Sequence, residues 1–246
     1  MTTRRDFLTT LGLTLGVAPI VRALGTENVA HKLPRVGIQL YTLRTLMEKD
    51  LEGTLAKVAG IGYKEVEFAG YFGRTPAQIR AILKTNHLTS PSSHIPLPAS
   101  DDAWKKSLDD AKAVGHEWAV LPWLDEAHRK EWAQFADKLN SLAAMSKKAG
   151  LKFAYHNHDF EFAKFENGTV LEMLLAKTDP KLVDFEMDIY WVTKAGGDPL
   201  AIIRQHPHRF PLMHAKDATA APARDMVDVG SGTIDFAKIF ASAKRS

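Results

Sequence analysis

Three pairs of chemically versatile side chains stand out in the second half of the chain. They are His156 and His158, Glu186 and Asp188, and His214 and Lys216. The members of each pair are two residues apart, and side chains two apart on a β-strand point to the same face. Imidazole and carboxylate ligands suit Mn, Zn, Fe or Co. If the pairs converge, they predict a divalent metal site with acid–base groups beside it.

The two carboxylates of the middle pair have an unusual setting. Glu186 and Asp188 lie in an otherwise apolar run, residues 183–191. Two carboxylates on one face of a buried strand are costly unless a cation compensates them. This setting favours a functional role over a structural one.

The segments that would carry these pairs are short, β-rich runs that recur roughly every 30 residues. The expected strands are 35–41, 64–68, 89–95, 118–122, 152–156, 183–188 and 210–214. Helical patterns lie between or after them, at 51–59, 76–86, 101–114, 130–149, 169–177, 199–205 and 235–244. Alternating strands and helices predict a parallel sheet, and this spacing favours an α/β (β/α)8 TIM barrel. The first strand is not followed by a glycine-rich phosphate loop, which disfavours a dinucleotide-binding fold.

In such a barrel, chemistry belongs at the carboxyl ends of the strands. Polar and aromatic side chains at several other strand ends are therefore expected to bind substrate: Gln39, Glu67, His94, Trp123 and Trp191. Aromatic faces can stack on the C–H surfaces of sugars. The candidates for moving protons are His158, Glu161 and Lys216, with Glu67 as a further candidate.

The first 23 residues have the pattern of an export signal. Arg4 and Arg5 precede an apolar run, residues 11–20, and a small-residue exit follows at Val21-Arg22-Ala23. The run is too short for a stable membrane anchor, and the paired arginines resemble the twin-arginine signal. We therefore expect a signal peptide at 1–23, a linker at 24–33, a barrel domain at 34–246 and a periplasmic location.

Composition narrows the function classes. The chain of 246 residues contains no cysteine, which excludes thiolate metal sites, cysteine nucleophiles and disulfide scaffolds. The formal net charge is +3, of which the first 23 residues contribute +2, so the remainder carries +1. A nearly neutral body lacks the basic patch that nucleic-acid binding requires.

Several motifs resemble the xylose-isomerase-like barrel superfamily, and most closely its sugar phosphate isomerase/epimerase branch. They are the runs at 155–162, 185–191 and 214–217, together with 36–44 and 62–67. The resemblance implies a single divalent ion, with Mn expected first and Zn, Co, Fe or Mg as alternatives. It places Asp188 and His214 on metal ligands of the sixth and seventh strands. His156 stands where relatives carry a carboxylate ligand, and Glu186 restores the missing negative charge, so the expected ligands are His156, Glu186, Asp188 and His214.

The same resemblance implies proton transfer between neighbouring carbons of a sugar or keto-sugar, by an isomerase or epimerase, with lyase or dehydratase activity in some members. An ion that chelates two oxygens of a hydroxy-ketone acidifies the C–H between them and stabilises the enediolate. The family's barrel also has an eighth strand, whereas only seven are counted here. We therefore favour a C-terminal truncation over a partner that supplies the missing strand or a barrel that is truly open. We expect a gap between the first and seventh strands, and an incomplete ligand set around Asp188 and His214.

Two other functions stay open. One is a non-catalytic carbohydrate-binding barrel, which need not retain stoichiometric metal. The other is a metal-dependent phosphodiesterase resembling endonuclease IV, which needs a multi-metal, histidine-rich centre and a basic groove. The low net charge of the body disfavours the second. The sequence does not decide whether the chain is a homo-oligomer, since an unpaired strand edge invites association.

Overall fold

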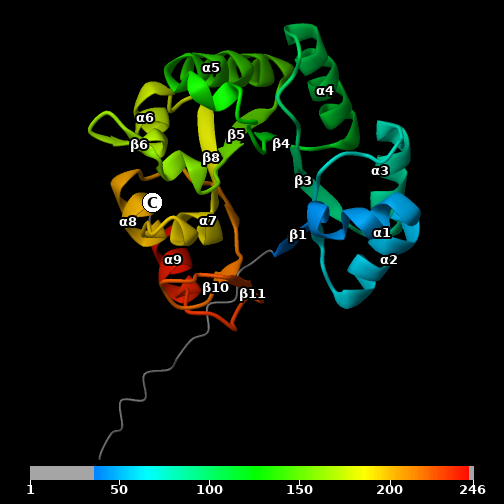
Figure 1. Ribbon diagram of the computed structural model, residues 1–246. Helices are drawn as coiled ribbons and strands as arrows, with labels where there is room; N and C mark the ends of the chain where they lie inside the picture. Colours follow the sequence, from blue (N-terminus) through cyan, green and yellow to red (C-terminus); the bar gives the residue numbers. More distant parts are fainter. Residues whose placement is uncertain (1–35, 244–246) are drawn as a thin grey trace, which may run out of the picture. The chain divides into compact units, whose positions relative to one another are not determined.

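The main sheet contains seven parallel strands and is drawn in Figure 1. The computed structural model describes residues 36–243, so the predicted signal peptide and linker lie outside the described residues. Along the sheet the order is β1-β2-β3-β4-β5-β8-β9. The strands are β1 (Gly37–Gln39), β2 (Glu65–Phe68), β3 (Thr89–His94), β4 (Trp118–Leu121), β5 (Lys152–His156), β8 (Val183–Asp188) and β9 (Leu212–His214). All seven predicted strands are confirmed.

Helices follow the strands as the sequence predicts. They are α1 (Arg44–Lys49), α2 (Leu51–Ile61), α3 (Pro76–Thr85), α4 (Asp101–Val114), α5 (Trp132–Ala149), α6 (Val170–Lys177), α7 (Ile189–Lys194), α8 (Pro199–Gln205) and α9 (Phe236–Ala243). Residues of α4, α5 and α6 share one apolar core with β5 and β8, while α2 and α3 pack with residues of β2 in a second core. The unpredicted helices are α1 and α7. Helix α7 interrupts the apolar run 183–191 because the Asp188 carboxylate accepts a hydrogen bond from Trp191 N and caps the helix.

The sheet is an incomplete (β/α)8 barrel. Among the described residues, β1 pairs only with β2 and β9 only with β8, so the expected gap between the first and seventh strands is present. Residues 220–229 could have supplied an eighth strand. Instead, β11 (Met226–Val227) from this segment pairs antiparallel with β10 (Asp217–Ala218) in a separate two-stranded sheet. A second small hairpin joins β6 (Lys164–Phe165) and β7 (Gly168–Thr169).

Alternation along the strands separates apolar from polar side chains. On β8, Phe185 and Met187 are buried in the apolar core shared with the helices, whereas Glu186 and Asp188 project to the opposite face. On β5, Tyr155 lies in that same core, and Ala154 packs with Trp118, Val120 and Leu212 in a small cluster on the other face. The carboxyl-terminal layer of this inner face is polar.

Strand register brings the polar layer together. His156 lies beside Glu186 across β5 and β8, and Asp188 lies beside His214 across β8 and β9. An irregularity between Glu65 and Glu67 shifts the pairing of β2 with β3, and Gln39 of β1 lies beside Glu67. In the described part of the chain, no helix has both the length and the apolar character needed to cross a membrane.

Candidate metal and active site

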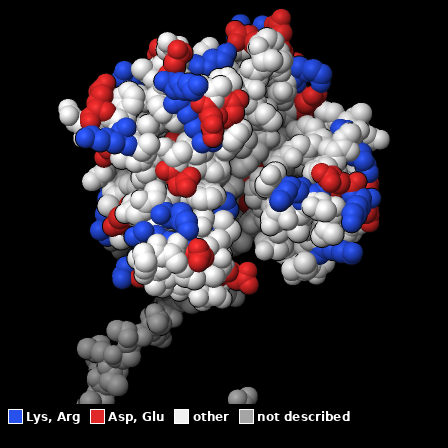
Figure 2. Space-filling view, viewed as in Figure 1, with Lys and Arg blue, Asp and Glu red and all other residues white. Residues whose placement is uncertain are grey.

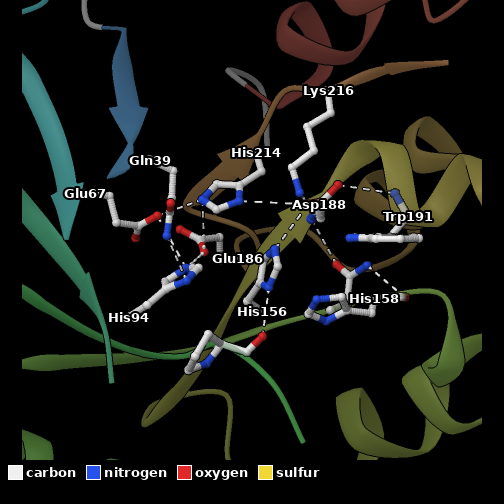
Figure 3. Close-up of polar contacts among 12 residues, drawn as sticks. Gln39, Glu67, His94, His156, His158, Glu186, Asp188, Trp191, His214 and Lys216 are labelled. Atoms are coloured by element: carbon white, nitrogen blue, oxygen red, sulfur yellow. Dashed lines mark hydrogen bonds and ion pairs between the residues drawn. The ribbon is translucent and has the colours of Figure 1, made fainter. Parts of the chain in front are cut away.

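Six ionisable side chains from five strands meet at the carboxyl ends of the sheet. They are Glu67 of β2, His94 of β3, His156 of β5, Glu186 and Asp188 of β8, and His214 of β9, and Figure 3 shows them facing one another. The expected ligands and two of the expected substrate-binding residues thus lie in one cluster. Its three carboxylates exceed the single nearby ammonium, that of Lys216, so the formal charge is negative when the imidazoles are neutral.

One half of the cluster surrounds His214 Nε2. This nitrogen lies 2.7 Å from Glu67 Oε2 and 3.3 Å from Glu186 Oε2. His94 Nε2 lies 2.8 Å from the same Glu186 oxygen and 3.3 Å from the same Glu67 oxygen. Gln39 Nε2 lies 3.1 Å from the other ring nitrogen of His94, so the Gln39 amide orients that ring.

The other half surrounds Asp188. Its Oδ2 atom lies 3.2 Å from His156 Nε2, 3.8 Å from His214 Nδ1 and 2.5 Å from Lys216 Nζ. His156 Nδ1 lies 3.0 Å from the Pro122 carbonyl oxygen, and this contact holds the ring so that Nε2 faces Asp188. A ligating histidine anchored through its second nitrogen is common at metal sites.

Neighbouring charges in the cluster shift the pKa values of its side chains in the direction opposite to the effect of burial. Burial alone would raise the pKa of Glu67, but His94 and His214 hold that pKa well below its usual range. Burial acts in the same way on Asp188, and His156 and Lys216 outweigh it, so its pKa is also lowered. Burial would lower the pKa of His214, yet Glu186 and Glu67 raise it to about 9. The protonated His214 ring therefore supplies the positive charge that these carboxylates require.

The donor set fits a divalent cation. Glu67, His94, Glu186 and His214 each offer one ligand atom, and these atoms lie within 4.8 Å of one another; the same holds for His156, Asp188 and His214. Glu67 Oε1 is buried without a hydrogen-bond partner among the described residues. Nitrogen and carboxylate oxygen are the ligands that Zn, Mn, Co and Fe accept, so the residues present are suited to such an ion.

His158 borders the cluster without joining it. Its ring stacks on Phe160 at 5.3 Å between centroids, and the His156 and Trp191 rings lie 4.8 and 5.6 Å away. Burial, with help from His156, lowers the pKa of His158 to about 3. Its Nδ1 atom is buried and has no hydrogen-bond partner in the described structure. His158 is therefore a neutral imidazole at neutral pH.

Glu161 lies behind His158. Its side chain is fully buried, accepts a hydrogen bond from the Tyr155 hydroxyl, and accepts another from the His158 backbone N–H at 2.8 Å. Burial raises the pKa of this carboxyl to about 7. The structure thus places Glu161 beside a proton-transfer candidate, whereas its own carboxylate is turned towards Tyr155.

The remaining predicted residues divide into two groups. Trp191 and Lys216 lie beside the cluster, and Lys216 Nζ is 5.9 Å from the centre of the Trp191 ring. Trp123 is 49% exposed and lies under the Arg129 guanidinium, 5.1 Å from its ring centre. The structure brings Gln39, Trp191 and Lys216 to the cluster and leaves Trp123 at the surface.

Two supporting residues were not predicted. Asn157 Oδ1 accepts a hydrogen bond from Asp188 N at 3.0 Å and ties the end of β5 to the end of β8. Tyr155 holds Glu161 from the helix side of β5. Asn157 lies between the two histidines in the sequence, and that position is the signal that could have identified it. No local pattern links Tyr155 to Glu161.

The raised pKa of Glu161 predicts that the stability of the protein depends on pH. Its folded-state pKa of about 7 lies above the ordinary value of 4.5, so the folded protein holds a proton that the unfolded chain releases. The free energy of unfolding should therefore fall as pH rises from about 4.5 through 7, by on the order of 2 kcal/mol. Glu161→Gln, which cannot titrate, should lose this fall in urea titrations between pH 5 and 8. Asp159→Asn, at an exposed neighbour, is the control. Equal pH profiles for wild type and Glu161→Gln would contradict the assignment.

Charged side chains of both signs are scattered over the face seen in Figure 2. On the face seen in Figure 2, Lys and Arg side chains are interspersed with Asp and Glu, and neither sign forms a continuous patch. This face offers no basic groove for a polyanion.

The chain is similar to known proteins over most of its length. A family model described as xylose isomerase-like TIM barrel matches residues 55–246. The inosose dehydratase of Bacillus licheniformis is 32% identical over 225 residues, which cover 82% of this chain and 69% of the relative. The structure of a sugar phosphate isomerase/epimerase from Parabacteroides distasonis superposes with a TM-score of 0.74 at 26% sequence identity. The matched region covers 93% of this chain and 87% of that protein's chain. The IolI protein with a bound zinc atom has a TM-score of 0.62 at 15% identity, with coverage of 85% and 84%, a likeness of fold alone.

Proposed function

The chain belongs to the xylose isomerase-like TIM barrel family. From this we propose that it is a metal-dependent enzyme that removes a proton from the carbon next to the carbonyl of a sugar or keto-sugar. The observation that carries the proposal is the cluster of three buried carboxylates and three buried or half-buried imidazoles at the carboxyl ends of the strands. Relatives named inosose dehydratase and sugar phosphate isomerase/epimerase support a sugar-like substrate. Dehydration and isomerisation share the first step, which is proton removal.

The catalytic ion is assigned to His156, Asp188 and His214. These three donors come from adjacent strands and leave room for substrate oxygens, as catalytic metal sites do. The likeness to the zinc-containing IolI protein supports a divalent ion. When bound, such an ion would polarise the carbonyl and hydroxyl oxygens of the substrate.

The chain's own groups supply the proton transfer. His158 is neutral at pH 7 because of its lowered pKa, and its half-buried ring lies beside His156 and Trp191, so the imidazole can accept a proton. In our proposal this ring takes the proton from the carbon next to the carbonyl, and the electron pair stays on the substrate as an enediolate. Returning the proton to the former carbonyl carbon, while the hydroxyl proton passes to the former carbonyl oxygen, gives isomerisation. If the enediolate instead expels a hydroxyl group from the β-carbon, that hydroxyl takes the proton and leaves as water, which gives dehydration.

Three further residues position the reacting groups. Glu161 accepts the backbone N–H of His158 and so fixes the loop that carries it. The Lys216 side chain is 34% exposed, and its Nζ atom, which contacts Asp188, can donate a hydrogen bond to the developing oxyanion. The half-buried face of Trp191 lies between His158 and Lys216 and suits the C–H surface of a sugar ring.

The test uses metal analysis followed by proton NMR. The purified protein is assayed for bound metal and then incubated in heavy water with a panel of free and phosphorylated keto-sugars. Deuterium at a carbon next to the carbonyl, in a metal-dependent reaction, is the expected result. An unsaturated product that has lost water identifies a dehydratase, and a rearranged sugar identifies an isomerase or epimerase. Sugar binding without deuterium uptake would instead indicate a non-catalytic carbohydrate-binding barrel.

The proposed location is the periplasm, reached through a twin-arginine signal. The motif lies outside the described residues, so the proposal rests on the sequence. Changing Arg4→Lys together with Arg5→Lys should abolish export, because the receptor reads the paired arginines. Cell fractionation and immunoblotting should find the variant in the cytoplasm only. Arg22→Lys, outside the motif, should be exported normally. Unchanged periplasmic yield of the double variant would refute the assignment.

A further inference from the structure

We propose that Glu67, His94, Glu186 and His214 form a second metal site, separate from the His156–Asp188–His214 centre and joined to it through the His214 ring. Their four ligand atoms come from strands β2, β3, β8 and β9. Figure 3 shows the four side chains pointing towards one another. This inference goes beyond the proposed function, because it holds whether or not the protein acts on a sugar.

The spacing of the four atoms suits tetrahedral coordination. The His–carboxylate distances between them are 2.7, 2.8, 3.3 and 3.3 Å. Zinc bonds of about 2.0–2.1 Å to nitrogen and oxygen put neighbouring ligand atoms about 3.3 Å apart. Two of these four distances match that spacing and the other two are about 0.5–0.6 Å shorter, while all the ligand atoms lie within 4.8 Å of one another.

A buried, unpartnered oxygen points to a cation independently. The Glu67 side chain is 9% exposed, and its Oε1 atom is buried without a hydrogen-bond partner among the described residues. An unsatisfied carboxylate oxygen in the interior is costly. A divalent ion next to this carboxylate removes that cost, either by binding Oε1 directly or by drawing the group into a two-oxygen contact.

The His214 ring presents one nitrogen to each site. Nε2 faces Glu67 and Glu186, and Nδ1 lies 3.8 Å from Asp188 Oδ2. With both ions bound, the ring bridges them, and its last proton is released to solvent. The new site has four protein donors, the number typical of a closed, structural metal site, whereas the other has three and leaves positions for a ligand.

The experiment counts metal ions on the full chain. Protein stripped with a chelator is dialysed against Zn²⁺, and bound zinc is measured by plasma mass spectrometry. Wild type should bind two ions per chain. The double variant Glu67→Gln with His94→Gln should bind one, and His156→Gln should also bind one. His116→Gln is the matched control, because His116 is a buried histidine that contacts Ser90 O and Tyr71 Oη, outside the cluster; this variant should keep two.

A cobalt titration of wild type tests the same point without substitutions. Co²⁺ absorption in the visible range should rise until the second equivalent, and circular dichroism should confirm that each variant is folded. One ion in wild type, retained by the Glu67/His94 double variant and lost by His156→Gln, would overturn the second site while leaving the catalytic centre in place. One ion retained by His156→Gln and lost by the double variant would overturn the two-site arrangement and the placement of the catalytic ion. No bound metal in wild type would overturn both.

Discussion

Asp188→Asn should lower turnover by at least about 10³-fold and reduce metal affinity at the His156–Asp188–His214 centre. One Asp188 oxygen contacts His156, His214 and Lys216, and the other caps α7. Asparagine has the same shape and can still cap the helix, so the loss reports the missing negative charge. A loss of several kcal/mol of transition-state stabilisation corresponds to about 10³-fold in rate.

Asp198→Asn is the matched control for this substitution. Asp198 caps α8 by accepting hydrogen bonds from Leu200 N and Ala201 N, and it lies outside the cluster. The control should keep wild-type metal content and turnover. Metal content is read by mass spectrometry and turnover by NMR with the substrate that the deuterium screen identifies. If Asp188→Asn keeps full metal and activity, the catalytic ion lies elsewhere.

His158→Asn should lower turnover by about 10²–10⁴-fold while leaving the bound metal unchanged. The ring borders the cluster but is not among the grouped donors. Asparagine keeps a polar atom near the Nδ1 position, and the backbone N–H that binds Glu161 is unaffected by the change. The loss should appear in kcat and in deuterium exchange at the substrate carbon, with KM changing much less.

The control for His158→Asn is His128→Asn, because the His128 side chain is exposed and its ring contacts only the neighbouring Asp125 among the described residues. Turnover of the control should match wild type. A His158→Asn variant that exchanges substrate protons at the wild-type rate would move the proton-transfer role to another group. Lys216 would then be the next candidate, because its ammonium lies beside Asp188 and Trp191.

Local physical rules determined much of this protein from its sequence. The seven strands, and helices such as 101–114, follow from hydrophobic periodicity and end signals that depend only on neighbouring residues. Because alternate strand residues share a face, the sequence also determined that Glu186 and Asp188 project together from β8. Family resemblance added the expectation that such strand ends form one site.

Tertiary structure alone decided how that site is divided. Glu67 and His214 are 147 residues apart in the sequence, and their contact exists because the sheet curls and strand pairing shifts at β2. The burial of Glu161 against Tyr155, and the exposure of Trp123 beside Arg129, depend on loops that pack on distant elements. Periodicity specifies which way a side chain points from its strand. Which distant side chain it meets is set by register and curvature, and these arise from the packing of the whole sheet.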